Sequence, residues 1–372
     1  MAIQYAYNSN VAAGTLTLSG GITLSSTSTL DAVRSGGLID VTSAITGAGD
    51  LNIASSASSG GVVQFSAANT YTGATTITTG TLQLNGSTSA SSAVNIGTAG
   101  ILSGNGTVNG SATLTGGGII NKSAGSIAGT LAVTGGNWNG AGTVTGAVTS
   151  SSGIFTIGSG ANLTSTAGVT GTGGDLVVNG TLTGALSTNS STTVSGTGTI
   201  TGNTIISGVH SPGNSPGVQT YSSNLSYTTG SSVTWELGVD GLGTRGTDFD
   251  GIDVGGTLDF SGATSLNLVF NFAGSSVDWT DSFWDTSRTG TAGWLIYDVA
   301  GSTTNFANLT VNAANWFGVT GGQFDVSRLN NTFSLYQDGS DIYLNYNVVP
   351  EPDVAMLLGG LGMLTLLRRR RA

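Results

Sequence analysis

The stretch from Val63 to Leu84 reads VQFSAANTYTGATTITTGTLQL, and it contains the pattern that decides the fold of the chain. It ends on Thr81-Leu82-Gln83-Leu84, in which polar and apolar residues alternate. Alternation with a period of two over a few residues predicts a short β-strand with one buried face. The Gly, Asn and Thr residues before it are typical of tight turns. The stretch therefore predicts short strands closed by turns.

The same plan recurs along the first half of the chain. The motif G-x-G-T-[VI]-x-G occurs at Gly104–Gly110, Gly140–Gly146 and Gly196–Gly202, and G-T-L occurs at Gly14, Gly80, Gly129, Gly180 and Gly256. A constant local motif at irregular spacing predicts a β-solenoid whose coils share one strand–turn plan but differ in loop length. A flat antiparallel sandwich with Gly-rich loops is the alternative. The motif differs from the dinucleotide fingerprint because its last Gly comes one residue too late.

Composition supports an all-β chain and excludes several classes of protein. Of 372 residues, 62 are Gly and 8% are charged, and there is no Cys. The lack of Cys excludes disulfides and thiolate metal sites. Nine basic residues against nineteen acidic ones argue against nucleic-acid binding, which needs clustered cations. Low charge also argues against ordinary disorder, which accompanies high charge and low hydrophobicity.

Charged and aromatic residues divide the chain into three parts. Residues 1–209 hold six charged side chains: Asp31, Arg34, Asp40, Asp50, Lys122 and Asp175. Residues 210–347 hold thirteen acids and five of the six Trp. The four Pro residues form pairs near the two boundaries, which are common sites of turns. We therefore predict a β-solenoid over 1–209, a Trp- and Asp-rich C-terminal β region over 210–347, and a separate tail over 348–372.

The middle region predicts further strands with larger side chains. We expect it to form more coils, or a compact β cap that closes the open end of the solenoid, because exposed strand edges invite aggregation. Residues 333–346 read FSLYQDGSDIYLNY, which predicts a hairpin turning at Asp338-Gly339.

The opening stretch resembles the autotransporter-associated β-strand repeat. The shared core is A-N-T-Y-T-G-x-T-T at Ala68–Thr76 followed by G-T-L at Gly80–Leu82, and the resemblance covers about fifty residues, 63–110. The family implies a right-handed parallel β-helix on an exported, surface-exposed chain, and it implies no catalysis.

The tail combines an apolar run with a terminal cationic cluster. Residues 354–367 are apolar apart from one Thr, and four Arg residues follow them. This order predicts a short transmembrane helix with its Arg residues on the cytoplasmic side. The run has fourteen residues, fewer than the roughly twenty that span a bilayer.

The layout of the tail resembles the PEP-CTERM sorting signal, in which V-P-E-P, a short helix and an Arg cluster follow one another. The resemblance implies processing by an exosortase, a transient inner-membrane anchor through 354–367, and export to the cell surface of a Gram-negative bacterium that makes extracellular polysaccharide. It implies recognition through Pro350, Glu351 and Pro352 and retention through Arg368, Arg369, Arg370 and Arg371. Residues 1–8 lack the basic and apolar regions of an export signal, so we expect the true start to lie upstream.

Few residues are candidates for a site. Asp248, Asp250 and Asp253 offer oxygen ligands for Ca²⁺, although their spacing matches no EF-hand loop, and solvated turn residues are the alternative. In the solenoid, Asp31 to Asp50 with Arg34 is the sole local group of the kind that a lyase needs. We interpret His210 as an ordinary coil residue, and we interpret Trp279, Trp284 and Trp294 as core residues rather than as a platform that stacks on sugars.

The sequence thus predicts a non-enzymatic, exported structural or adhesin-like surface protein without a cofactor. We expect an exosortase as its processing partner and extracellular polysaccharide, or the biofilm matrix, as its surroundings. A carbohydrate-binding or carbohydrate-active protein, a lyase or a hydrolase, on the same scaffold is the alternative.

Overall fold

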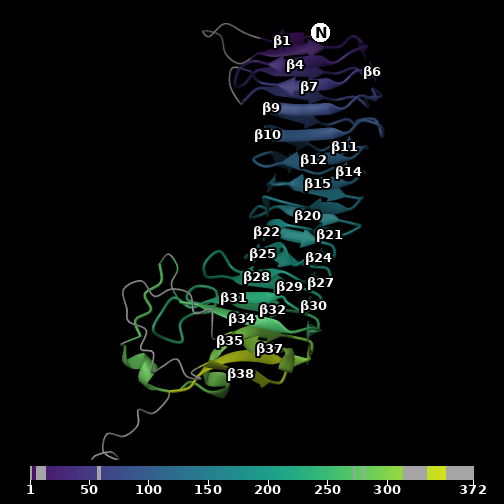
Figure 1. The fold of residues 1–372 in the computed structure, drawn as a ribbon. Helices are drawn as coiled ribbons and strands as arrows, with labels where there is room; N and C mark the ends of the chain where they lie inside the picture. Colours follow the sequence, from purple (N-terminus) through teal and green to yellow (C-terminus); the bar gives the residue numbers. More distant parts are fainter. Residues whose placement is uncertain are drawn as a thin grey trace, which may run out of the picture.

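The computed structural model describes residues 2–5, 14–56, 60–270, 272, 274–279, 281–312 and 333–348, and it shows a parallel β-solenoid. Figure 1 shows the coils stacked into a rod, with the N-terminus at one end and the lateral loops near the other. The predicted all-β parallel solenoid is confirmed. Helix in the described part of the chain is limited to three short 3₁₀ turns, η1 (Ser282–Asp285), η2 (Gly290–Ala292) and η3 (Phe306–Asn308).

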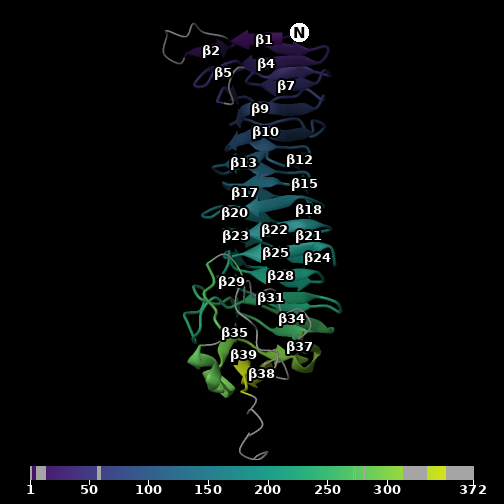
Figure 2. The same ribbon diagram turned by 60° about the vertical axis from the view of Figure 1, so that its left-hand side comes forward.

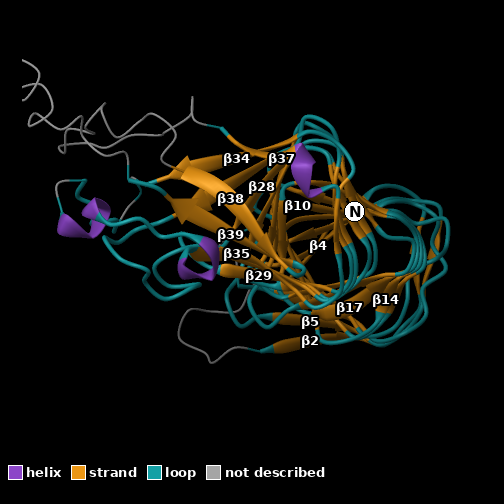
Figure 3. Cartoon of the chain, turned by 90° about the horizontal axis from the view of Figure 1, so that it is seen from below, coloured by secondary structure: helices purple, strands orange, loops and turns teal. Residues whose placement is uncertain are grey.

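Three ladders of parallel strands run along the rod, and Figure 3 shows them around one shared core. The first ladder consists of β1 (Ala2–Tyr5), β4 (Ser28–Ala32), β7 (Leu51–Ala54), β9 (Thr75–Leu84), β10 (Val94–Gly104), β12 (Ala112–Thr115), β15 (Leu131–Thr134), β18 (Val148–Ser150), β21 (Val169–Gly171), β24 (Leu186–Thr188), β27 (Thr204–Ile206), β30 (Leu225–Tyr227), β33 (Leu258–Phe260) and β36 (Thr303–Thr304).

The second ladder shares the long strands β9 and β10 with the first, so that both belong to one 26-stranded sheet. Its other members are β2 (Thr15–Leu18), β5 (Leu38–Val41), β8 (Val62–Phe65), β13 (Ile119–Lys122), β16 (Gly136–Trp138), β19 (Ile154–Ile157), β22 (Gly174–Val178), β25 (Thr192–Gly196), β28 (Val209–Pro212), β31 (Ser232–Glu236), β34 (Thr264–Val269) and β37 (Leu309–Val311).

The third ladder begins with the separate pair β3 (Ile22–Leu24) and β6 (Ile45–Gly47). An 11-stranded sheet continues along this side of the rod. It contains β11 (Thr107–Val108), β14 (Ser126–Ile127), β17 (Ala141–Val144), β20 (Asn162–Ser165), β23 (Thr181–Thr183), β26 (Thr199–Ile200), β29 (Val218–Tyr221), β32 (Gly251–Val254), β35 (Trp294–Val299), β39 (Asp341–Tyr346) and β38 (Phe333–Asp338).

Alternation along each strand builds the core. In β12, Ala112 and Leu114 are buried while Thr113 and Thr115 point outward. The next coil repeats the pattern in register, so Leu114 lies opposite Val133. Burying a Leu side chain in such a stack contributes about 2 kcal/mol. Each coil thus lends an apolar layer to its neighbours, and one continuous core fills the rod.

The first Gly of the G-x-G-T-[VI]-x-G motif lies where one coil touches the coil before it. A Cβ atom at Gly104 would lie 2.3 Å from the carbonyl oxygen of Leu84, and at Gly196 it would lie 2.2 Å from that of Val178. At Gly140 the corresponding distance is 2.0 Å, to the carbonyl oxygen of Lys122. Any side chain here would collide with the neighbouring backbone. The motif therefore marks the tight contacts between coils.

Coil length is regular in the middle of the rod and increases toward its C-terminal end. Ala112 pairs with Leu131, 19 residues later, and Leu186 pairs with Thr204, 18 residues later. Leu225, however, pairs with Leu258, 33 residues later, and Leu258 pairs with Thr303, 45 residues later. The extra residues belong to two insertions, 237–250 and 270–293, which we call the lateral module. Figures 1 and 2 show its loops beside the last coils.

The C-terminal end is closed by an antiparallel hairpin, as the sequence predicts. Strands β38 and β39 pair from Phe333–Tyr346 to Asp338–Asp341, and Gly339 takes a positive φ of 59° in the turn. Strand β39 also pairs antiparallel with β35, so the hairpin covers the end of the third ladder. The parallel ladders continue through the predicted boundary at 209, because β28 pairs with both β25 and β31. The division into three units remains a prediction.

Residues 349–372 of the predicted tail lie outside the described residues, and with them the predicted transmembrane helix at 354–367. Among the residues that are described, none of the helices is long and apolar enough to cross a bilayer.

Candidate functional site at the C-terminal end of the solenoid

A buried aromatic cluster joins the lateral module to the C-terminal hairpin. The rings of Trp279 and Trp284 lie 4.3 Å apart, and Tyr346 packs edge-on against Trp284 at 5.2 Å. Trp294 and Phe333 complete this cluster. All three Trp residues are at most 2% exposed. The interpretation of Trp279, Trp284 and Trp294 as core residues is therefore confirmed.

The last described residues are fastened to the lateral module. The Arg288 and Tyr346 backbones exchange two hydrogen bonds, of 2.7 and 2.9 Å, and the Tyr346 hydroxyl donates to the carbonyl oxygen of Trp284 at 2.9 Å. The Val348 amide donates to Ser287 Oγ at 2.9 Å. The Arg288 guanidinium lies 4.5 Å from the centre of the Phe283 ring, a cation–π contact. The chain is thus held to the folded body up to Val348, the first residue of the predicted tail.

Asp240 holds the two insertions of the lateral module together. Its carboxylate accepts a hydrogen bond from Trp284 Nε1 at 2.7 Å and from the backbone amide of Asp278 at 2.9 Å. Partial burial raises the pKa of Asp240, and these two hydrogen bonds oppose that rise. The carboxylate links residue 240 of the first insertion to residues 278 and 284 of the second.

The three predicted Ca²⁺ ligands have separate hydrogen-bond partners. Asp248 accepts from the backbone amide of Thr244 at 2.7 Å, and Asp253 pairs with Arg245 at 2.6 Å. Asp250 is fully buried and accepts from two backbone amides. No group of three or more His, Cys, Asp or Glu side chains suited to a metal ion occurs among the described residues. The structure thus does not bring the three acids to one point.

Asp250 instead connects three segments of the chain. Its two carboxylate oxygens accept from the amides of Gly217, at 2.8 Å, and Glu236, at 3.0 Å, while Trp235 Nε1 donates to its carbonyl oxygen at 2.7 Å. Burial raises the pKa of Asp250 to about 8 against the effect of the two amide donors. Burial also raises the pKa of Glu236. These contacts fasten the first insertion to the turn that ends at Gly217.

His210 lies inside the solenoid on β28, where it belongs to a buried polar network. Its Nε2 atom lies 2.8 Å from Gln219 Oε1, and its Nδ1 atom lies 2.6 Å from the Tyr227 hydroxyl. Since Gln219 Oε1 only accepts, Nε2 carries the proton and Tyr227 donates to Nδ1. Tyr297 in turn donates to Tyr227 at 3.3 Å. Burial lowers the pKa of His210 to about 4, so the ring is neutral near pH 7. His210 is a coil residue, as interpreted from the sequence.

The acids of the first coils bind separate donors in the next coil. Asp31 accepts from the amide of Ser56, Asp40 from Gln64 Nε2 and Asp50 from the amide of Ala74. These contacts join neighbouring coils. The three acids of the group around Arg34 thus each have a hydrogen-bond partner of their own in the following coil.

Sequence reasoning did not anticipate the position of Lys122. Its side chain is fully buried at the end of β13, and its Nζ atom has no hydrogen-bond partner among the described residues. Burial lowers the pKa of Lys122 to about 8. The alternation in Ile120-Asn121-Lys122 could have predicted this burial, because it places Lys122 on the same inward face as Ile120.

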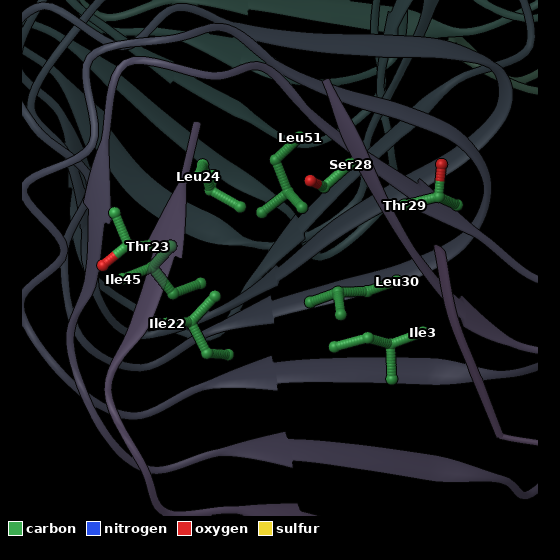
Figure 4. A pocket seen from close by; sticks show the side chains of 9 residues that line it. All are labelled: Ile3, Ile22, Thr23, Leu24, Ser28, Thr29, Leu30, Ile45 and Leu51. Atoms are coloured by element: carbon green, nitrogen blue, oxygen red, sulfur yellow. The ribbon is translucent and has the colours of Figure 1, made fainter. Parts of the chain in front are cut away.

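A small apolar pocket of about 40 Å³ lies at the N-terminal end of the rod. Figure 4 shows Ile3, Ile22, Leu30 and Leu51 pointing into it. These side chains continue the apolar layers of the core into the first coil. We interpret the pocket as a packing gap of the core.

Comparison with known proteins identifies the tail. The family model of the PEP-CTERM protein-sorting motif matches residues 348–371. A search of curated proteins returns no match to the chain. The predicted sorting signal is therefore confirmed, and the motif implies an exported protein that an exosortase sorts. The individual roles of Pro350, Glu351, Pro352 and Arg368–Arg371, which lie in the matched segment, remain predictions, as does the resemblance of 63–110 to the autotransporter-associated repeat.

Proposed function

We propose that this PEP-CTERM protein is a non-enzymatic structural component of the bacterial cell surface, with its rod embedded in the extracellular polysaccharide matrix. An exosortase processes the tail, through Pro350-Glu351-Pro352, after a transient inner-membrane stage anchored by 354–367. The cell is a Gram-negative bacterium, and the mature rod contributes to adhesion or to the biofilm.

One observation carries this proposal: the middle of the rod presents no charge. Residues 51–174 contain a single charged residue, Lys122, and that side chain is fully buried. The surface is built instead from hydroxyl and amide groups. On the first ladder, the outward residues in register over six successive coils are Thr29, Asn52, Thr76, Asn95, Thr113 and Ala132.

An uncharged surface of hydroxyl and amide groups suits a protein that is surrounded by hydrated polysaccharide. Hydroxyl and amide groups both donate and accept hydrogen bonds, as the hydroxyl groups of sugars do. A soluble domain ordinarily keeps about a quarter of its surface residues charged, which limits self-association. A long neutral rod instead permits close contact with a neutral or crowded matrix. The sorting motif supplies the route to that location.

Export and processing are tested by following the C-terminus of the chain. The chain, with an export signal fused to its N-terminus, is produced in a bacterium that carries an exosortase and in the same strain without it. We expect mass spectrometry of the surface or extracellular form to show loss of Arg368–Arg371 only when the exosortase is present. The variant Glu351→Ala should stay in the membrane fraction with an intact tail, and Asp353→Asn serves as the matched control. Recovery of an extracellular form that still carries Arg368–Arg371 would contradict the proposal.

Matrix association is tested in the same cells. We expect the mature protein to sediment with the extracellular polysaccharide and to be released when that polysaccharide is digested enzymatically. A protein that stays free in the medium while the matrix is intact would overturn the structural role.

A further inference from the structure

A notch interrupts the neutral surface of the rod where the first ladder turns into the second. Strand β12 ends at Thr115 and β13 begins at Ile119, so three residues form this corner. Three residues also form the corner between β18 and β19, but Gly135 alone connects β15 to β16. The middle corner therefore extends less far outward than the corners on either side. The recess that it leaves has a volume of about 410 Å³.

The floor of this notch is bare backbone. Gly135 has a φ of 121°, and a Cβ atom there would lie 3.0 Å from the Cα atom of Gly116 in the preceding coil. Gly153, on the following coil, also has a positive φ, of 64°. Gly135 is buried against the preceding coil, whereas Gly116, Gly117 and Gly153, which also border the notch, are exposed, so a ligand can approach the main chain closely at those three positions. The volume lies within the range of about 300–1,000 Å³ that is usual for ligand pockets.

Polar and apolar groups border the notch, and none is charged. Thr134, Asn137 and Thr156 contribute two hydroxyl groups and an amide. Ile154 is 56% exposed, the largest exposed fraction among the exposed large apolar side chains of the described residues. An exposed apolar side chain beside hydroxyl and amide groups matches a sugar ring, which has apolar C–H faces and hydroxyl edges.

The lack of charge decides which polymer fits. An acidic polysaccharide would need cations, and residues 51–174 supply only the buried Lys122. An extended peptide that binds by adding a strand would need an open strand edge. The strands here are paired on both sides, since β16 lies between β13 and β19 and β15 lies between β12 and β18.

We infer that the notch around Gly135 is a binding site for a neutral polysaccharide chain, with Ile154 contacting the ring face and Asn137 and Thr134 bonding the hydroxyl groups. This inference rests on the proposed matrix function, to which it adds the class of polymer that is bound and the surface that binds it.

Binding is measured with the full chain by affinity electrophoresis in gels that contain dextran, galactomannan or alginate. The variant Asn137→Asp adds one charge to the notch with little change of shape, and Ile154→Asp replaces its exposed apolar contact. We expect each to weaken binding to at least one neutral polymer by about tenfold, because each places a charged group without a partner in the contact. The matched controls are Asn95→Asp, on the first ladder, and Leu242→Asp, at a side chain of the lateral module that is 44% exposed.

Each outcome has a definite meaning. Circular dichroism and the thermal midpoint first establish that all four variants fold as the wild type does. If the control variants weaken polymer binding as much as the notch variants do, the polymer binds over a broad surface and not at the notch, and the proposed matrix function is unaffected. If only the gel that contains alginate, an acidic polysaccharide, retards the protein, the inference that the ligand is a neutral polysaccharide is wrong. Binding to none of the three polymers would overturn the site, whereas the sedimentation experiment decides the matrix function separately.

Discussion

At the scale of single residues, Lys122 conflicts most clearly with its surroundings. A buried ammonium group without a hydrogen-bond partner is unfavourable, and the lowered pKa of Lys122 expresses that cost. The native pKa of about 8 lies below the ordinary value of 10.5 that holds in the unfolded chain. Between these two values Lys122 binds more proton in the unfolded chain than in the folded one, so the contribution of Lys122 to stability should become more favourable as the pH rises over this interval.

We therefore predict that Lys122→Met stabilises the protein by about 1–3 kcal/mol at pH 7. Its advantage over the wild type should decrease as the pH rises from about 8 to 10.5. Urea denaturation of both proteins across this pH range measures the difference and removes the contributions of the groups they share. A variant that is less stable than the wild type at pH 7 would show that the amine has a favourable partner.

At the scale of elements, the two long insertions differ from the coils that carry them. The coils are held by ladders and by the stacked core, whereas the lateral module depends on the aromatic cluster and on a few side-chain hydrogen bonds. Asp240 is central to the module because both insertions contribute to its contacts, through residue 240 itself and through Trp284 and Asp278.

We predict that Asp240→Ala loosens the lateral module and leaves the solenoid intact. The loss of hydrogen bonds to a charged group should cost about 1.5–3 kcal/mol locally. Acrylamide should then quench the Trp fluorescence more strongly, while the far-ultraviolet β-sheet signal stays unchanged. Asp240→Asn keeps an acceptor for Trp284 Nε1 and should behave more like the wild type, and Asp175→Ala serves as a control on the rod. Unchanged quenching in Asp240→Ala would mean that the aromatic cluster holds the module alone.

At the scale of the whole molecule, the rod is a stack in which each coil contacts its neighbours. Stability in such an array is approximately a sum over coils and the interfaces between them. A complete coil is therefore removable if the register is kept. Ala112 and Leu131 occupy equivalent positions, since each pairs with the strand before it in the first ladder.

We predict that deletion of residues 112–130 leaves a folded rod that is one coil, about 4.8 Å, shorter. Val94 should then pair with Leu131, and Ser111 should connect directly to β15. Deletion of residues 112–121 removes β12 and most of β13 but keeps β14, so the remaining part of this coil has no strand with which to continue the first and second ladders, and we expect it to abolish folding. Circular dichroism and a single cooperative thermal transition distinguish the two results. If both deletion variants fold equally well, the rod is not built from complete coils that must stay in register.

The strands, the tight corners and the closing hairpin were predictable because local sterics govern them. The alternation in Thr81–Leu84 assigns an inward face without knowledge of any neighbour, and Gly104 is required wherever the backbones of two coils touch. Asp338-Gly339 similarly indicates a turn between two alternating runs. The sorting motif was predictable for a related reason: its order of groups along the chain is itself the signal.

Tertiary structure decided everything that depends on which segments become neighbours. Composition shows five Trp residues after residue 230, but only the fold gathers Trp279, Trp284 and Trp294 into one cluster, in which Trp284 packs against Tyr346 beside the start of the sorting segment. The notch at Gly135 depends on the difference between a one-residue corner and the three-residue corners on either side, which lie a full coil away in sequence. Alternation and turn chemistry act over a few residues, whereas these features arise from contacts between coils, and such contacts exist only once the chain has closed on itself.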